Sequence, residues 1–107
     1  MTTEKSTKAR RLQPASREDQ ILEAALRVAS RGGFAHMTSA LIADEAECSE
    51  ALVRHYLGVR AVMCTAVMAE AVKRKVLAVV AEGVALRDPT ALAAPERLRR
   101  AALRGMR

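Results

Sequence analysis

Helix-capping residues and glycines divide this sequence into segments that are too short for anything except small helices. Ser16, Thr38 and Ser49 are residues of the kind that begin a helix, because the side-chain oxygen accepts a free backbone N–H. Apolar residues follow each of them at the three- and four-residue spacing of a helix. Glycine ends the pattern at Gly33 and Gly58, where a chain leaving a helix often turns left-handed. The spacing predicts three helices, over residues 16–31, 38–46 and 50–57.

The composition supports a chain built from helices alone. Half of the 107 residues are hydrophobic, but Phe34 and Tyr56 are the only aromatic residues, and most of the others are Ala, Val, Leu and Met. Such a mixture favours helices and leaves few residues for strands. The length is sufficient for one small domain. We therefore expect an all-α fold.

A longer helix is predicted after Gly58, from about residue 59 to residue 82. Its apolar residues lie all around the helix axis, which is typical of a helix that is buried on every side. Four of them are expected to pack on the first helix: Val62, Met63, Ala66 and Val67. The polar run 73–75 interrupts this pattern as a solvated or phosphate-facing turn. The preceding helices are too short to cover both sides, so further structure is expected on the second side.

After Gly83 the sequence predicts a loop and then a last helix over residues 96–107. In that helix arginines share one face, namely Arg97, Arg100, Arg104 and Arg107. The opposite face carries Leu98, Ala102 and Met106. An arginine face of this kind is usually solvated, and the alternative is an amphipathic surface for a membrane or a nucleic acid.

The net charge of +6 is concentrated at the two ends of the chain. Residues 1–17 carry five basic side chains against one acidic, and residues 84–107 carry six against two. Residues 18–83 carry seven basic against nine acidic side chains. A basic end suits a polyanion such as DNA, because neutralised phosphates release counterions, although it also keeps a chain soluble. We predict that residues 1–15 form a flexible basic arm.

Several classes of protein find no support in this sequence. Cys48 and Cys64 are too few for a disulfide framework or a zinc site, and His36 and His55 add no metal-ligand spacing. The sequence contains neither a pair of carboxylates at a set spacing nor a nucleophile beside a base, so nothing in it indicates an enzyme. The start of the chain lacks a signal sequence, and the uncharged apolar stretch 61–69 is too short to cross a membrane. We expect a cytoplasmic protein without metal, cofactor or enzymatic activity; a redox role of either cysteine stays open.

Two short helices joined by a three-residue turn, after a longer helix, make a helix-turn-helix, whose second helix enters the major groove of DNA. On the helix 50–57, Val53 and Leu57 are one turn apart and are expected to face the core. The opposite face carries small and polar side chains: Glu50, Ala51, Arg54 and His55. Arg54 is the strongest candidate for a base contact, because its fork matches guanine, and Glu50 can accept from the amino group of cytosine.

Four further residues flank this face, where a phosphate backbone would run: Thr38, Ser49, Tyr56 and Arg60. Thr38 and Ser49 lie at helix starts, whose free N–H groups attract phosphate. Arg60 would add a charge-assisted contact. Local roles are the alternative for several site residues: capping for Thr38 and Ser49, packing for Tyr56, and solvation for Arg54 and His55. Combined with the helix spacing, these residues favour DNA.

The run from Ile21 to Met63 resembles the DNA-binding domain of the TetR/AcrR family of bacterial regulators. The shared features are the ILxAA opening at 21–25, Gly33-Phe34, Thr38, Ile42-Ala43 with Ala46, the capping Ser49, the segment 52–56 and the basic Arg60. The resemblance implies DNA contacts from the following residues: Thr38, Ser49, Glu50, Ala51, Arg54, His55, Tyr56 and Arg60.

Several positions depart from the family pattern. Glu47 stands where the family has a glycine in the turn, which costs about 1–2 kcal/mol if the left-handed geometry is kept. Cys48 replaces a valine, Leu57 a phenylalanine and Arg60 a lysine. These departures bear on affinity and stability rather than on the fold.

The resemblance also implies how the chain is organised. The expected segments are a flexible basic arm at 1–15, a three-helix, homeodomain-like helix-turn-helix domain at 16–60, a long fourth, connecting helix at 61–83, and an incomplete helical segment at 84–107. Family members have a longer C-terminal domain that dimerises and binds a small-molecule inducer. Residues 84–107 would be the start of that domain, truncated. A homodimer is therefore expected only if the domain is completed, and a chain this short supports no inducer.

The sequence thus predicts a sequence-specific transcriptional regulator of the repressor type, which binds a palindromic operator in double-stranded DNA through the helix 50–57 and has no membrane partner. The alternative is a truncated interaction module that pairs with a full-length relative or does not bind DNA by itself. The size of the protein in solution, with and without DNA, separates the two hypotheses.

Overall fold

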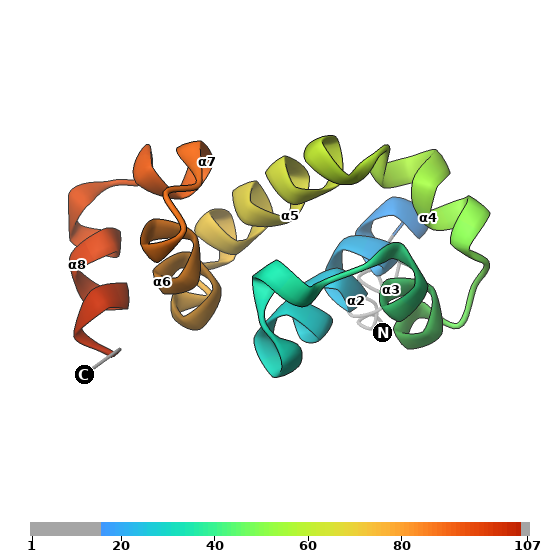
Figure 1. Cartoon of the computed structure of the whole chain (residues 1–107), viewed down its shortest axis with the longest axis horizontal. Helices are drawn as coiled ribbons and strands as arrows, with labels where there is room; N and C mark the ends of the chain where they lie inside the picture. The colour runs from blue at the N-terminus through green and yellow to red at the C-terminus, as the bar shows by residue number, and fades with distance from the viewer. Residues whose placement is uncertain (1–15, 106–107) are drawn as a thin grey trace, which may run out of the picture.

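The computed structural model of this chain describes residues 16–105. These residues form seven α-helices and one short 3-10 helix, with no strand in that range (Figure 1). The expected all-α fold is therefore confirmed. The predicted basic arm at residues 1–15, together with Met106 and Arg107 of the predicted last helix, lies outside the described residues. Within residues 16–105, no helix combines the length and the apolar character needed to span a lipid bilayer.

The helices form two groups, connected by one helix that runs between them (Figure 1). The first group consists of α2 (Arg17–Gly32), the 3-10 helix η1 (Phe34–His36), α3 (Ser39–Ala46) and α4 (Glu50–Leu57). The connecting helix is α5 (Arg60–Arg74). The second group consists of α6 (Leu77–Ala85), α7 (Pro89–Leu92) and α8 (Glu96–Arg104).

Each α-helix of the first group begins at a capping hydroxyl that the sequence predicts. The hydroxyl oxygens of Ser16, Thr38 and Ser49 each accept a hydrogen bond, at 3.1 Å, from the backbone N–H three residues further on. A cap of this kind contributes about 1 kcal/mol, because it satisfies a donor that the first turn leaves free. The observed bounds of these three helices differ from the predicted ones by one residue at most.

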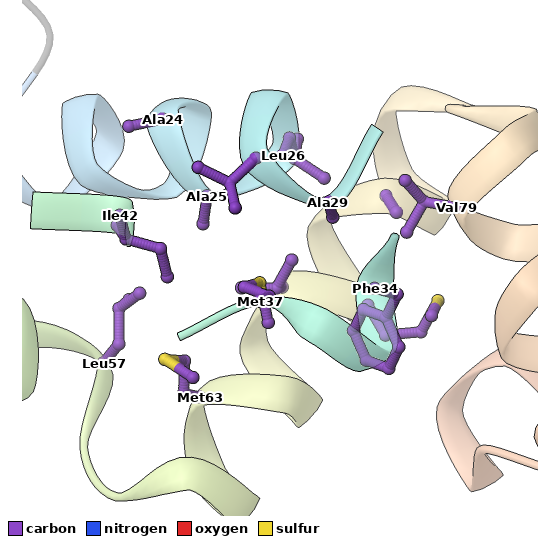
Figure 2. Packing of buried hydrophobic residues seen from close by; sticks show 14 of the residues in the cluster. Ala24, Ala25, Leu26, Ala29, Phe34, Met37, Ile42, Leu57, Met63 and Val79 are labelled. Carbon is purple, nitrogen blue, oxygen red and sulfur yellow. The ribbon is translucent and has the colours of Figure 1, made fainter. Parts of the chain in front are cut away.

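One apolar core extends through both groups of helices. Figure 2 shows Ile42, Leu57 and Met63, from α3, α4 and α5, gathered beside α2. Phe34 of η1 lies on the side where Val79 of α6 enters the same core (Figure 2). Several alanines on the buried face of α2 leave room for these longer side chains. The second group of helices is therefore packed onto the first.

The prediction of one long fourth helix over residues 59–82 is wrong, because the chain forms two helices there. α5 ends at Arg74, and Lys75 takes a left-handed conformation with φ 59°. The N–H groups of Lys75 and Val76 return to carbonyls near the end of α5, at 3.2 and 2.9 Å. Of the polar run 73–75, which was expected to form a turn, residues 73 and 74 still belong to α5, and only Lys75 forms the turn that ends the helix and allows α6 to fold back.

The fold-back of α6 explains how the all-round apolar α5 is covered. Met63 and Val67 are buried in the common core, as predicted for packing on α2. Ala71, one turn after Val67 on the same face, is buried, and so is Met68 on another side of α5, because α6 and α7 pack against α5. Val62 was expected to pack on the first helix, but its side chain is 56 % exposed.

Gly83 was expected to end a helix and instead lies inside α6. It is buried, and a Cβ atom at this position would be 2.4 Å from Met68 Cε and 2.7 Å from Ala91 Cβ. Glycine is thus needed for the close approach of α5, α6 and α7. The loop expected after it contains α7, whose start is capped by Asp88, with Oδ2 accepting from the Ala91 N–H at 3.0 Å.

Candidate functional site

α4 presents one side to the core and the opposite side to solvent, as the sequence predicts. Val53 and Leu57 are both buried, so the helix is anchored along one side. The predicted site residues of this helix lie away from that side: Ala51, Arg54, His55 and Tyr56 are exposed, and Glu50 is half-buried. A helix anchored in this way has a fixed register, so its outward side chains are available to a partner in a defined order.

A charged cluster positions α3 against α2. Arg27 Nε donates to Glu45 Oε2 at 2.7 Å, and Arg31 Nη2 donates to Glu45 Oε1. These hydrogen bonds, the one from Arg27 first and the one from Arg31 second, lower the pKa of the Glu45 carboxyl below its ordinary value. The sequence analysis missed this cluster, because the arginines precede Glu45 by 18 and 14 residues and no local pattern connects them.

A three-residue turn, residues 47–49, connects α3 to α4. Glu47 has φ 58° and ψ 50°, and its N–H returns to the carbonyls of Ala43 and Asp44. The Cys48 N–H also donates to Ala43 O, at 3.0 Å. The left-handed geometry anticipated at Glu47 is therefore kept without glycine, at a cost of about 1–2 kcal/mol.

Thr38 and Ser49 are exposed at the starts of α3 and α4, and both act as caps. The local role considered for them in the sequence is therefore present. A helix leaves up to four N–H groups without an internal partner at its start, so a single cap leaves others for an anion. Capping and binding of a phosphate at the same helix end are compatible.

Glu50 and Arg54 form an ion pair on the outward side of α4. Arg54 Nη2 is 3.4 Å from Glu50 Oε1, across one turn of the helix. The other carboxylate oxygen, Oε2, lies 3.5 Å from the hydroxyl of Ser39, the first residue of α3. Exposed pairs of this kind stabilise a helix by only about 0.3–0.5 kcal/mol. The pair holds Arg54 near Glu50 while remaining easy to separate.

His55 and Tyr56 add two rings to the same side. Their ring centroids are 4.8 Å apart with planes at 80°, an edge-to-face arrangement. Both side chains are exposed, Tyr56 by 37 %. The packing role considered for Tyr56 therefore accounts for only part of its ring.

Arg60 is held by backbone carbonyls, a role that the sequence analysis did not assign to it. Its Nη1 donates to Met37 O at 2.5 Å and its Nη2 to Ala35 O at 2.9 Å. The guanidinium therefore orders the chain immediately before the capping Thr38. Arg60, Thr38 and Arg54 line one hollow of 280 Å³ between the start of α3 and the start of α5. The structure thus brings these three predicted residues together.

Glu82 of α6 holds the other end of the same segment and was also missed. Its Oε1 accepts from the Phe34 N–H at 2.7 Å and its Oε2 from the Ala35 N–H at 3.1 Å. Gly33, which precedes this segment, has φ 101°, a backbone conformation that residues with a side chain rarely adopt, and a Cβ there would be 3.3 Å from His36 Cδ2. One signal was present in the sequence: Glu82 is the single charge in the apolar run 77–85.

The two cysteines are free, and each is half-buried. Burial raises the pKa of the Cys64 thiol, which disfavours the reactive thiolate. Among residues 16–105, no three His, Cys, Asp or Glu side chains are grouped closely enough to hold a metal ion.

Comparison of the chain with protein-family models, with curated proteins and with solved structures gave no match. A functional assignment therefore depends on the geometry of α3, α4 and the residues around them.

Proposed function

We propose that α3, the turn 47–49 and α4 form a helix-turn-helix, and that residues 16–60 are a three-helix, homeodomain-like DNA-binding domain of the TetR/AcrR type. The observation that carries this proposal is α4 itself. It is a helix of eight residues, anchored by Val53 and Leu57, with polar and small side chains on its free side. A helix with these properties fits the major groove, where base edges carry the sequence information.

In this proposal Arg54 and Glu50 read the bases. Arg54 donates two hydrogen bonds to one guanine, and Glu50 accepts from the amino group of a cytosine. Ala51 is small enough to contact a thymine methyl group. The weak Glu50–Arg54 pair of the free protein separates when each side chain finds its base, and each good base contact gives about 1–3 kcal/mol of discrimination.

The remaining site residues position the helix on the phosphate backbone. Thr38 and Ser49 place two helix N-termini beside phosphates, and Tyr56 and His55 flank the groove. Arg60 uses two of its N–H donors on Ala35 and Met37, and the other donors are left for a phosphate in the hollow that it shares with Thr38. These contacts set orientation rather than sequence preference.

The chain is then a sequence-specific transcriptional regulator of the repressor type. Two copies bind a palindromic operator, because two-fold symmetry places two α4 helices about one turn of DNA apart.

Selection of duplexes from a random pool, followed by binding measurements, tests this function. We expect the selected duplex to bind at least about 10³-fold more tightly than a scrambled duplex of equal length and salt. Arg54→Ala should weaken binding of the selected duplex about tenfold to hundredfold and affect the scrambled duplex less.

Arg100→Ala is the matched control. Arg100 is an exposed arginine of α8 that pairs with Glu96 at the same four-residue spacing, at 2.7 Å. The Arg100→Ala substitution removes one positive charge and leaves α4 unchanged. Equal binding of selected and scrambled duplexes, or equal losses in the two variants, would contradict the proposal.

An interaction module that does not bind DNA by itself is the second candidate. Exposed leucines on the second group of helices favour it: Leu77 is 40 % exposed, Leu86 53 % and Leu103 43 %. Such side chains suit a protein partner. Measurement of molecular mass in solution, with and without DNA at low salt, separates the two functions. A stable monomer without affinity for DNA supports the interaction module.

A further inference from the structure

The segment 34–37, which lies between α2 and α3, is held by side chains from two helices that follow much later in the sequence. Glu82 of α6 accepts hydrogen bonds from the first two N–H groups of the segment, at 2.7 and 3.1 Å. Arg60 of α5 donates to the carbonyl oxygens of Ala35 and Met37, at 2.9 and 2.5 Å. Hydrogen bonds with an ionised side chain are roughly twice as strong as those between neutral groups. The place of this segment therefore depends on α5 and α6.

The start of α3 follows this segment directly. Met37 is buried in the common core together with Phe34 (Figure 2), and the next residue is Thr38, whose hydroxyl accepts from the Leu41 N–H at 3.1 Å. Thr38 and Arg60 line the hollow of 280 Å³ at the start of α3. A displaced segment would therefore move both a helix start and a guanidinium at this hollow.

The charge of Glu82 has the wrong sign for a direct contact with DNA. A carboxylate repels phosphate, so its removal should by charge alone strengthen binding to any duplex. The side chain is half-buried, and both of its oxygens accept from N–H groups of the segment 34–37. A weakening of DNA binding after removal of Glu82 would therefore have to come from the lost position of that segment.

We propose that Glu82 is a positioning residue for DNA binding, a role that rests on the function proposed above. The DNA-binding unit of this chain then extends through α6 instead of ending at residue 60. By fixing the segment 34–37, Glu82 keeps Thr38 and Arg60 where both reach the phosphate backbone. Phosphate contacts set affinity and orientation without reading the bases. The loss of Glu82 should therefore weaken binding to every duplex by a similar factor.

Hydrogen exchange of backbone amides in the whole chain, measured without DNA, tests the first step. Glu82→Ala should accelerate exchange of the Leu41 N–H, which donates to the hydroxyl of Thr38 at the start of α3. The matched reference is the Leu52 N–H, which donates to the hydroxyl of Ser49 at the start of α4 over the same 3.1 Å. A general loss of stability accelerates both amides alike, because global unfolding exposes every amide. We expect the acceleration at Leu41 to exceed that at Leu52 by about tenfold.

The affinity for DNA, measured with the selected and the scrambled duplex at one salt concentration, tests the second step. Glu82→Ala should weaken binding of both duplexes about fivefold to tenfold, whereas Arg54→Ala weakens mainly that of the selected duplex. Glu82→Gln keeps one acceptor oxygen and should weaken both by a smaller factor. Glu70→Ala is the control, because it removes the same charge and only a pair within α5, and it should weaken neither. Circular dichroism at the temperature of the titration verifies that each variant is folded.

Equal acceleration at Leu41 and Leu52 would overturn the proposal, because Glu82 would then stabilise the whole protein without positioning the start of α3. Unchanged or tighter binding of both duplexes by the Glu82→Ala protein would overturn it as well, since only the charge would then matter.

Failure of the proposed function gives different results. If the unchanged protein binds neither duplex, DNA binding is refuted and the role of Glu82 in it is refuted too, while the exchange rates still show whether Glu82 positions α3. Equal binding of the two duplexes, weakened alike by Glu82→Ala, would contradict sequence-specific recognition and support the positioning role.

Discussion

The α-helices α2, α3 and α4 each begin at a hydroxyl that caps the helix, whereas α5, α6 and α8 begin at Val59, Val76 and Pro95, which provide no side-chain cap. In the first group, the start of each helix is therefore encoded within three residues of sequence. In the second group only the four-residue α7 has a side-chain cap, from Asp88. The position of α6 depends instead on contacts with residues far away in the sequence.

The two groups also differ in how their charges are used. Arg27 and Arg31 of the first group are neutralised by Glu45, so their charges help to assemble α2 and α3. Arg97 and Arg104 of the second group have no such partner among the described residues. The comparison indicates that charge pairing helps to assemble the first group, whereas these two arginines of the second group remain exposed to solvent.

The prediction with the largest expected effect tests whether close packing determines how the helices of the second group are arranged. Gly83→Val should destabilise the protein by about 3 kcal/mol, because its side chain would overlap Met68 and Ala91. Urea unfolding followed by circular dichroism measures this free energy. Gly32→Ala is the control, since a Cβ at Gly32 meets nothing within 4 Å, and it should stabilise the protein by about 0.5–1 kcal/mol. A Gly83→Val protein as stable as the original would refute the packing argument.

A smaller effect is expected at the connection between the groups. Glu82→Ala should cost about 2 kcal/mol, because the N–H groups of Phe34 and Ala35 lose a charged acceptor. Glu82→Gln keeps one acceptor oxygen and should cost about half as much. Glu70→Ala, which removes only a pair within α5, is the reference and should cost under about 0.5 kcal/mol. If the Glu82 and Glu70 variants are equally stable in urea, the carboxylate does not connect the groups.

The caps themselves can be removed or added. Thr38→Ala and Ser49→Ala should each cost about 1 kcal/mol. Val59→Ser should stabilise the protein by about 0.5–1 kcal/mol, because Val59 is 68 % exposed at the uncapped start of α5 and has the extended backbone of a cap. Thermal unfolding of the three variants measures these changes. A destabilising Val59→Ser would show that the uncapped start of α5 is not a weakness.

The smallest effect concerns acid stability in the first group. Because its hydrogen bonds with Arg27 and Arg31 lower the pKa of Glu45, its ionised form stabilises the folded state. This contribution is complete above the ordinary carboxyl pKa and is lost over the acidic range in which the pH falls through the lowered pKa. Glu45→Gln should therefore show a smaller loss of stability over that range, as measured by urea unfolding at each pH. An unchanged pH profile would contradict the ionic role of Glu45.

Sequence reasoning succeeded where a structure depends on neighbouring residues. Thr38 and Ser49 are caps, and α4 buries Val53 and Leu57, as predicted. Sequence reasoning failed where contacts between residues far apart in the sequence determine the structure. The break at Lys75 was taken for an interruption within one helix, because a lysine carries no signal for a left-handed turn. The carbonyl contacts of Arg60 were missed because Met37 is 23 residues away in the sequence.

The sequence by itself determined that the chain is helical and where the helices of the first group begin, because capping and apolar spacing act over one or two turns. The tertiary structure decided that the chain folds back after Arg74, that Gly83 lies inside a helix, and that Glu82 and Arg60 hold the segment before α3. These outcomes depend on which surfaces meet in space, and no local pattern records that. Whether a glycine ends a helix or permits close packing depends on what lies opposite its missing side chain.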